Sequence, residues 1–277
     1  MATEIRASSR PGSKRADETT SIIDFDDGRR LAYAEYGPSD GVPLVFLHGT
    51  PGSRRLAALF EGAAREHDVR LLAPDRPGYG RSSPRPARTV SDASQFVGAV
   101  LDDADVQTAG IVAFSGGAPY ALATAAKRPE VVHRVDVVSG ATPPAVSEET
   151  PTTQRFLATL ARTTPTLLGG LFRGQAWLAR HVDPAIVVAQ YTAEGTVASV
   201  PDDVAATVKA DFVEAVSRHR RGVITEFRNT ATEWNVDFDD SEAPVARWHG
   251  EDNTNVPVGD VRQLETQLPT ADIHVLD

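Results

Sequence analysis

The sequence has no cysteine and a single methionine among its 277 residues. Without cysteine the chain cannot form disulfides or thiolate metal sites, and it has no thiol nucleophile. It also lacks any run of about 20 apolar residues, and residues 1–20 have no apolar centre. The sequence therefore predicts neither a membrane span nor a signal peptide, and we expect a cytoplasmic protein with no membrane partner.

Positive charge is scarce as well. The chain has 28 Lys and Arg against 38 Asp and Glu, a formal net charge of −10. An acidic surface repels phosphates, which argues against a nucleic-acid partner. The densest basic cluster, Arg218, Arg220 and Arg221, is expected to be a solvated helix face. The chain has no G-x-x-x-x-G-K-[ST] loop and no metal-type histidine spacing, so no cofactor and no metal are expected.

What the sequence does contain is an alternation of apolar strand-like runs with helix-like segments, typical of a mostly parallel sheet wrapped by helices. Strands are predicted at 21–26, 29–36, 42–47, 69–73, 111–114, 131–138, 244–248 and 273–276. Helices are predicted at 54–67 and 90–103, and from the end of the fifth strand to Arg128.

Between about 141 and 240 the alternation stops, and helix-like segments take over. We expect helices at 154–162, 175–180, 203–211 and 212–228, with breaks at Pro165, Gly169-Gly170, Pro184 and Pro201. The predicted organisation is a disordered leader (1–20), the first part of an α/β core (21–140), a helical cap or lid (141–240) and the final part of the core (241–277).

The run Ile111 to Phe114 stops at Ser115, which is followed by Gly116 and Gly117. A buried strand that ends at a serine and continues as a helix leaves that side chain on a sharp turn above the sheet. The usual nucleophile elbow is G-x-S-x-G, and Ala113 takes the first glycine position here. Ser115 is therefore the candidate nucleophile.

The chain resembles the α/β-hydrolase-fold superfamily, with a cap inserted after the sixth strand. The motifs that carry the resemblance are His48-Gly49-Thr50-Pro51-Gly52, Asp75-Arg76-Pro77-Gly78-Tyr79-Gly80-Arg81-Ser82, the elbow Ala113-Phe114-Ser115-Gly116-Gly117, and Gly250 to Pro257. The resemblance implies an α/β-hydrolase fold and attack by Ser115 on a carbonyl group. It also implies that the backbone N–H groups of Thr50 and Gly116 form the oxyanion hole, with His48 and Gly49 shaping the loop. We expect residues 75–82 to form a rigid structural turn.

The carboxylate and the histidine that would complete a catalytic triad with Ser115 match the family pattern less well. The family pattern G-x-x-D-x-x-V-P places its carboxylate at Asn253, whereas Asp252 lies one residue earlier; we favour Asp252 and keep Asn253 open. The family histidine follows the last strand. His274 is the nearest candidate base, but it lies within that strand, and we expect the histidine beyond Asp277.

Two functions are compatible with these residues. The first is a serine hydrolase that cleaves a small ester, amide or related acyl substrate through an acyl-enzyme on Ser115. A dehalogenase of this fold would carry an aspartate at the elbow, so Ser115 argues against that activity. The alternative is a non-catalytic ligand-binding homologue, which Asn253 and the missing histidine would suit.

Overall fold

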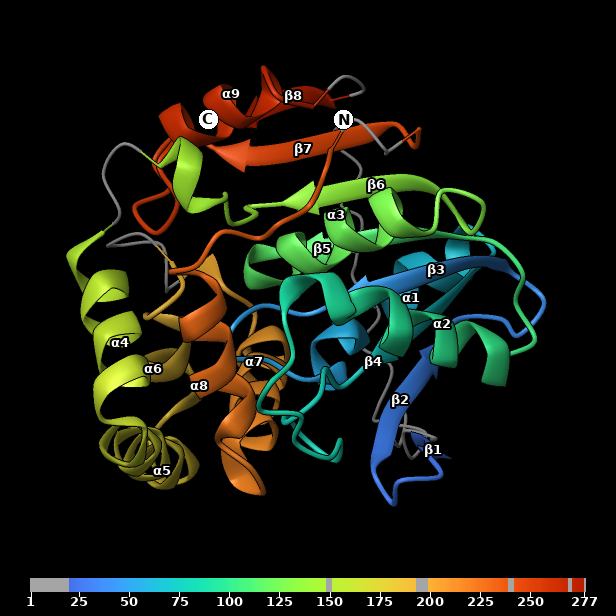
Figure 1. Cartoon of the computed structure of the whole chain (residues 1–277). Helices are drawn as coiled ribbons and strands as arrows, with labels where there is room; N and C mark the ends of the chain where they lie inside the picture. Colours follow the sequence, from blue (N-terminus) through green and yellow to red (C-terminus); the bar gives the residue numbers. More distant parts are fainter. Residues whose placement is uncertain (1–19, 148–150, 193–198, 239–241, 269–270, 277) are drawn as a thin grey trace, which may run out of the picture.

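The computed structural model describes residues 20–147, 151–192, 199–238, 242–268 and 271–276; the predicted leader lies almost entirely outside them. Eight strands of the described residues form one sheet in the order β1-β2-β4-β3-β5-β6-β7-β8 (Figure 1). The pairs β1–β2 and β2–β4 are antiparallel, and all pairs from β4 to β8 are parallel. The predicted fold class, a mostly parallel sheet flanked by helices, is confirmed.

The strands lie close to their predicted positions. They are β1 (Thr20–Asp24), β2 (Arg30–Tyr36), β3 (Val42–Leu47), β4 (Val69–Pro74), β5 (Ala109–Phe114), β6 (Val132–Val138), β7 (Val245–Gly250) and β8 (Ala271–Leu276). The α-helices are α1 (Glu61–Glu66), α2 (Ala93–Asp103), α3 (Ala118–Lys127), α4 (Thr152–Thr163), α5 (Pro165–His181), α6 (Pro184–Val188), α7 (Asp202–Ser217), α8 (Arg221–Asn229) and α9 (Val258–Glu265). The 3-10 helices include η1 (Arg54–Phe60), η2 (Val90–Asp92), η3 (Ser115–Gly117) and η4 (Pro144–Val146).

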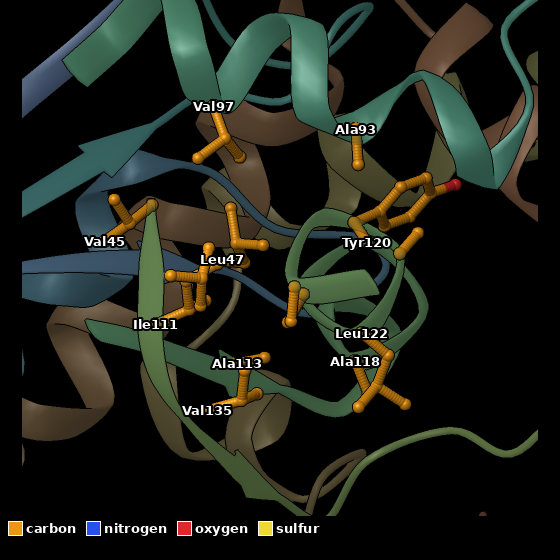
Figure 2. Close-up of a cluster of buried hydrophobic side chains, with 14 of the residues drawn as sticks. Val45, Leu47, Ala93, Val97, Ile111, Ala113, Ala118, Tyr120, Leu122 and Val135 are labelled. Atoms are coloured by element: carbon orange, nitrogen blue, oxygen red, sulfur yellow. The ribbon is translucent and has the colours of Figure 1, made fainter. Parts of the chain in front are cut away.

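The main core lies between the sheet and the helices α2 and α3. Figure 2 shows Val45, Leu47 and Ile111 of the central strands facing Val97 of α2, and Leu122 of α3 belongs to the same buried cluster. All five side chains are at most 2% exposed. Continuous apolar runs such as β3 and β5 are typical of strands that helices cover on both faces, which fits their central place in the sheet.

Local signals explain where several helices begin. Thr89 and Asp92 form a capping box at the start of η2, which continues into α2. Pro165 and Pro184 lie in the first turn of α5 and α6, where a missing N–H costs nothing. The predicted breaks at these two prolines therefore mark helix starts.

Four details of the helix prediction differ from the structure. The segment 54–67 is a 3-10 helix followed by the short helix α1. α5 runs through Gly169 and Gly170, because Leu168, Phe172 and Ala176 bury one stripe along its whole length and packing outweighs about 1 kcal/mol per glycine. The boundary predicted between helices 203–211 and 212–228 lies instead at residues 218–220, between α7 and α8. The sequence analysis did not predict α9.

The carboxyl ends of the parallel strands point toward the helices α4 to α8, which connect β6 to β7 (Figure 1). Ligands of open α/β sheets bind outside the carboxyl ends of the strands. The loops after β3, β4, β5 and β7, which carry the four sequence motifs, all lie at this edge.

Candidate active site

Ser115 lies directly after β5, at the first residue of η3. Its φ of 50° is in the left-handed region, which is uncommon for a residue with a side chain and costs of the order of 1–3 kcal/mol. Gly117 makes the tight turn possible, since a Cβ there would lie 2.3 Å from the Leu47 carbonyl oxygen. The strand, the strained residue and the helix that follows make up a nucleophile-elbow geometry.

The loop after β3 lies against this elbow. A Cβ on Gly116 would lie 2.2 Å from Thr50 Oγ1 and 3.2 Å from Thr50 N, and a Cβ on Gly49 would lie 3.5 Å from Ser115 Cβ. Thr50, Gly116 and Ser115 are therefore close together. The N–H groups of the first helical turn have no intrahelical acceptor, so the Gly116 N–H is available for another partner.

His48 is fully buried, and both its ring nitrogens are engaged. Nδ1 lies 2.8 Å from the Gly49 carbonyl oxygen, and Nε2 lies 3.2 Å from the Arg76 backbone N–H. Nδ1 therefore carries the proton and Nε2 accepts. Burial, helped by the positive charge of Arg76, holds the pKa of His48 well below its ordinary value. A neutral ring without a free nitrogen stabilises the loop and has no lone pair left for Ser115.

A buried carboxylate from the inserted helices completes this side of the site. Glu226 of α8 accepts hydrogen bonds from Arg76 (2.8 Å from both Nε and Nη2), Arg88 (2.6 Å), Tyr79 (2.7 Å) and the Thr50 hydroxyl (2.5 Å). Burial alone would raise the pKa of Glu226, but the two guanidinium groups outweigh it and lower the pKa below the usual range. Glu226 is therefore an ionised structural anchor for Thr50.

Arg76 extends this anchor to the backbone of the oxyanion-type loop. Its guanidinium donates to the carbonyl oxygens of His48 and Gly49, the latter at 3.0 Å. The motif that contains Arg76 therefore ties the loop after β3 to the inserted helix α8. Residues 75–82 form a largely buried connection between the two parts of the chain, with Tyr79 in the apolar cluster of α4, α5, α7 and α8.

A second carboxylate holds the far end of the same loop. Asp211 of α7 accepts from the Ser53 backbone N–H and from the Ser53 hydroxyl, each at 2.7 Å. Burial raises the pKa of Asp211 to about 7. The sequence analysis assigned no role to Glu226 or Asp211, although a glutamate on the apolar stripe that Val223 begins was a usable signal.

The loop after β7 is organised by Asn253. Its Oδ1 accepts the backbone N–H groups of Asn255 and Val256, each at 3.0 Å. Asp252 is exposed, whereas Asn253 is half-buried. The asparagine at the motif position thus forms the turn, and the exposed aspartate beside it contributes nothing to the bonds just described.

His274 lies too far along the sheet to reach Ser115. The register aligns Phe114 with Val138, Val138 with Trp248, and Trp248 with His274. Three strand spacings separate His274 from the residue before Ser115, about 14 Å between backbones, whereas proton transfer needs about 3 Å. Its ring stacks on Trp248 with centroids 4.1 Å apart, so we do not retain His274 as a base candidate.

The other histidines do not lie beside Ser115 in the chain or in the strand register. His249 at the end of β7 is buried, with Nε2 2.8 Å from the Val256 carbonyl oxygen. The remaining four lie at helix ends, on a strand or between helices: His67, His133, His181 and His219. Within the described ranges, no group of three or more His, Cys, Asp or Glu side chains is arranged to hold a metal ion.

A family model described as "alpha/beta hydrolase fold" matches residues 42–182. The chain belongs to the α/β-hydrolase fold family. An uncharacterized hydrolase, YcgS of Bacillus subtilis, is 30% identical over 130 residues, or 47% of this chain and 43% of the relative. A haloalkane dehalogenase of Mycobacterium marinum is 30% identical over 162 residues, 57% of this chain and 53% of the relative. These matches span about half the length of each relative.

The fold match extends over nearly the whole chain. The solved structure of the enol-lactonase from Burkholderia xenovorans LB400 superposes with a TM-score of 0.69 at 19% identity, covering 93% of this chain and 91% of that one. At this identity the likeness concerns the fold alone. The α/β-hydrolase scaffold hosts several chemistries, so the reaction has to be argued from the residues at the site.

Proposed function

We propose that this α/β-hydrolase-fold protein cleaves a small ester, amide or related acyl substrate through an acyl-enzyme on Ser115. One observation carries the proposal: Ser115 sits in a strained left-handed turn at the carboxyl end of β5, with Thr50 and Gly116 packed beside it. Strained backbone is a common property of catalytic positions, and ligands of open α/β sheets bind outside the carboxyl ends of the strands.

In the proposed reaction, Ser115 Oγ attacks the carbonyl carbon while its proton passes to a base. The negative charge on the carbonyl oxygen is met by the N–H groups of Thr50 and Gly116. The base gives this proton to the leaving alcohol or amine as its bond to the carbonyl carbon breaks. Water, deprotonated by the same base, then attacks the acyl-enzyme, and the acid leaves as the proton returns to Ser115 Oγ. Glu226 and Arg76 keep the Thr50 loop fixed during these steps, since both lie behind the loop in hydrogen-bonded contact with it.

The proposal places the orienting group in the loop after β7, at Asn253 or Asp252, and the base in a histidine that follows β8, as the resemblance implies. Asn253 can hold an imidazole in one tautomer, but it adds no charge to stabilise an imidazolium. We therefore expect modest turnover numbers, with the oxyanion contacts supplying most of the rate acceleration.

The experiment is covalent labelling of the full-length protein with a fluorophosphonate, followed by peptide mapping and ester-hydrolysis assays. Ser115→Ala should lose both the label and the turnover. Ser139→Ala is the matched control, because Ser139 also has a left-handed φ (49°) at the end of the adjacent strand β6. It should keep both.

One observation favours a second candidate, a ligand-binding homologue without turnover. Asn253 replaces the expected carboxylate, and its side-chain oxygen is already occupied by two backbone N–H groups. In that case small apolar acyl compounds would bind, and Ser115→Ala would leave binding intact with no hydrolysis to lose. Ser115-dependent turnover would exclude this alternative.

A further inference from the structure

The inserted helix α5 is apolar on both of its faces. Leu168, Phe172 and Ala176 are buried against the other inserted helices. On the opposite side, the large apolar side chains are between 51% and 61% exposed: Leu167, Leu171, Trp177 and Leu178. A helix that is hydrophobic all round is normally covered on all sides. We therefore expect the exposed side of α5 to bind a partner.

Two glycines make this exposed face flat. Gly170 and Gly174 lie between the leucines, and a Cβ built on either one would meet nothing within 4 Å. Helical spacing places both with the exposed leucines and Trp177 on one side of the helix. We name this set the α5 outer face: Leu167, Gly170, Leu171, Gly174, Trp177 and Leu178.

The charge around the α5 outer face is opposite to that of the rest of the chain. Residues 152–181 contain four arginines and no aspartate or glutamate, so all 38 acidic residues lie elsewhere. Arg173 and Arg180 lie four residues before and three residues after Trp177, which makes them its neighbours on the helix surface. Arg155 and Arg162 lie on α4, where Phe156 is 58% exposed.

These four arginines differ from other exposed arginines of the described residues in their ion pairing. Exposed arginines elsewhere pair locally, as Arg65 does with Glu61 and Arg134 with Asp136. By contrast, the side chains of Arg155, Arg162, Arg173 and Arg180 form no ion pair with any residue in the described ranges. The unpaired charges therefore remain available for an anionic partner.

We propose that α4 and α5 form a docking surface for an anionic lipid membrane. Leucines and a tryptophan on one face with arginines at its rim are the arrangement by which helices lie in a membrane interface. The arginine stems can cover apolar surface while their charged ends reach lipid phosphates. In the described ranges no helix is both long and apolar enough to cross a bilayer. The proposed contact is with the membrane surface.

A second copy of the chain fits this surface less well. A two-fold symmetric contact places the same patch on both sides of the interface. Arg173 and Arg180 of each copy would then lie near those of the other, with no carboxylate between 152 and 181 to separate them. Anionic headgroups bring the opposite charge, so the charge pattern favours lipid.

The test is co-sedimentation of the full-length protein with phosphatidylglycerol vesicles and, in parallel, with phosphatidylcholine vesicles. We expect binding to the anionic vesicles that weakens strongly when salt rises from about 0.1 M to about 1 M. Trp177 fluorescence should shift to shorter wavelength on binding, and Trp177→Phe should remove that shift. The measurement needs no substrate, so its result is independent of the proposed hydrolase activity.

Two sets of variants locate the contact. Replacing Leu167, Leu171 and Leu178 together by Gln should abolish vesicle binding, with the melting temperature checked separately. Arg173→Gln with Arg180→Gln should weaken it by about fivefold per arginine. The matched pair Arg65→Gln with Arg128→Gln removes the same charge from α1 and from the end of α3, and should leave binding unchanged.

Three results would overturn the proposal. The first is absence of binding to phosphatidylglycerol vesicles at low salt. The second is an equal loss of vesicle binding in the Arg173/Arg180 variant and in the Arg65/Arg128 control, which would mean that binding depends only on the net charge of the protein. The third is a dimer in sedimentation analysis that the leucine variant dissociates while vesicle binding is absent, which would assign the face to a second copy.

Discussion

The two ends of the proposed catalytic machinery differ in how they are built. At β3 and β5, the loop with Thr50 is fixed from behind by buried charges, Glu226 and Arg76, both at most 1% exposed. At β7 and β8, the loop is held by hydrogen bonds of the neutral side chains of Asn253, His249 and Gln154, the last of these on α4, and the histidine in β8 lies about 14 Å away across the sheet. The proposed nucleophile and oxyanion positions thus rest on buried charged groups, whereas the proposed acid loop is held by neutral hydrogen bonds.

This difference shows where the inserted helices act. α8 supplies Glu226 and α7 supplies Asp211, and both carboxylates bind the segment that follows β3. The inserted helices are therefore part of the framework that positions Thr50, besides covering the sheet edge. Any variant that loosens α8 should affect the β5 side of the site before the β7 side.

The largest expected effect is that of Glu226→Gln. The amide leaves Arg76 and Arg88 buried without a countercharge, and breaking a buried pair in this way costs about 3–5 kcal/mol. Urea unfolding measures the loss. Glu35→Gln is the matched control, because Glu35 pairs with Arg70 at a partly exposed position and should cost about 1 kcal/mol or less. Equal losses in the two variants would contradict the buried anchor.

Gly116→Ala compared with Gly250→Ala contrasts the two ends directly. The new Cβ at Gly116 would lie 2.2 Å from Thr50 Oγ1, which Glu226 and Arg76 hold in place, whereas a Cβ at Gly250 meets nothing within 4 Å. We expect Gly116→Ala to lower kcat by about 100-fold or more, as loss of an oxyanion donor does. The kcat of Gly250→Ala should stay close to that of the wild type. A similar loss of kcat in both variants would contradict the difference between the two ends of the site.

The stability of the loop anchors should depend on pH through Asp211. Its pKa is raised from 3.8 to about 7 in the folded protein, so the folded state binds the proton more tightly than the unfolded state. The stabilisation is complete below about pH 3.8 and is lost as the pH rises to about 7, by at most about 1.4 kcal/mol per pH unit. Chemical unfolding at several pH values should show this slope in wild type, and Asp211→Asn should flatten it. An unchanged slope would contradict the buried, raised pKa.

The smallest effects are expected in the loop after β7. Asn253→Ala removes the acceptor of two backbone N–H groups and should cost about 1–2 kcal/mol in thermal unfolding. Asp252→Ala, at the exposed position one residue earlier, should change stability by less than about 0.5 kcal/mol. A larger loss of stability in Asp252→Ala than in Asn253→Ala would mean that Asp252, and not Asn253, stabilises the turn.

The sequence predicted the parts of this site that depend on local pattern. The strand–serine–glycine run predicted a sharp turn at Ser115, and the structure has a left-handed residue there. The family resemblance pointed to Thr50, which lies beside Gly116; the catalytic roles of these residues stay predictions. The position of Glu226 on the apolar stripe of its helix signals burial, but the sequence does not reveal its partner, because Arg76 lies 150 positions earlier in the chain. The sequence analysis predicted a break at Gly169-Gly170, whereas α5 is continuous there because tertiary packing stabilises it.

The central claim is that Ser115 faces two backbone donors, and a crystal structure of the fluorophosphonate-treated protein tests it most directly. The account predicts a phosphonyl group on Ser115 Oγ with its oxygen about 2.7–3.1 Å from both Thr50 N and Gly116 N. A phosphonyl oxygen directed to solvent, or a label on another residue with Ser115 unmodified, would contradict it.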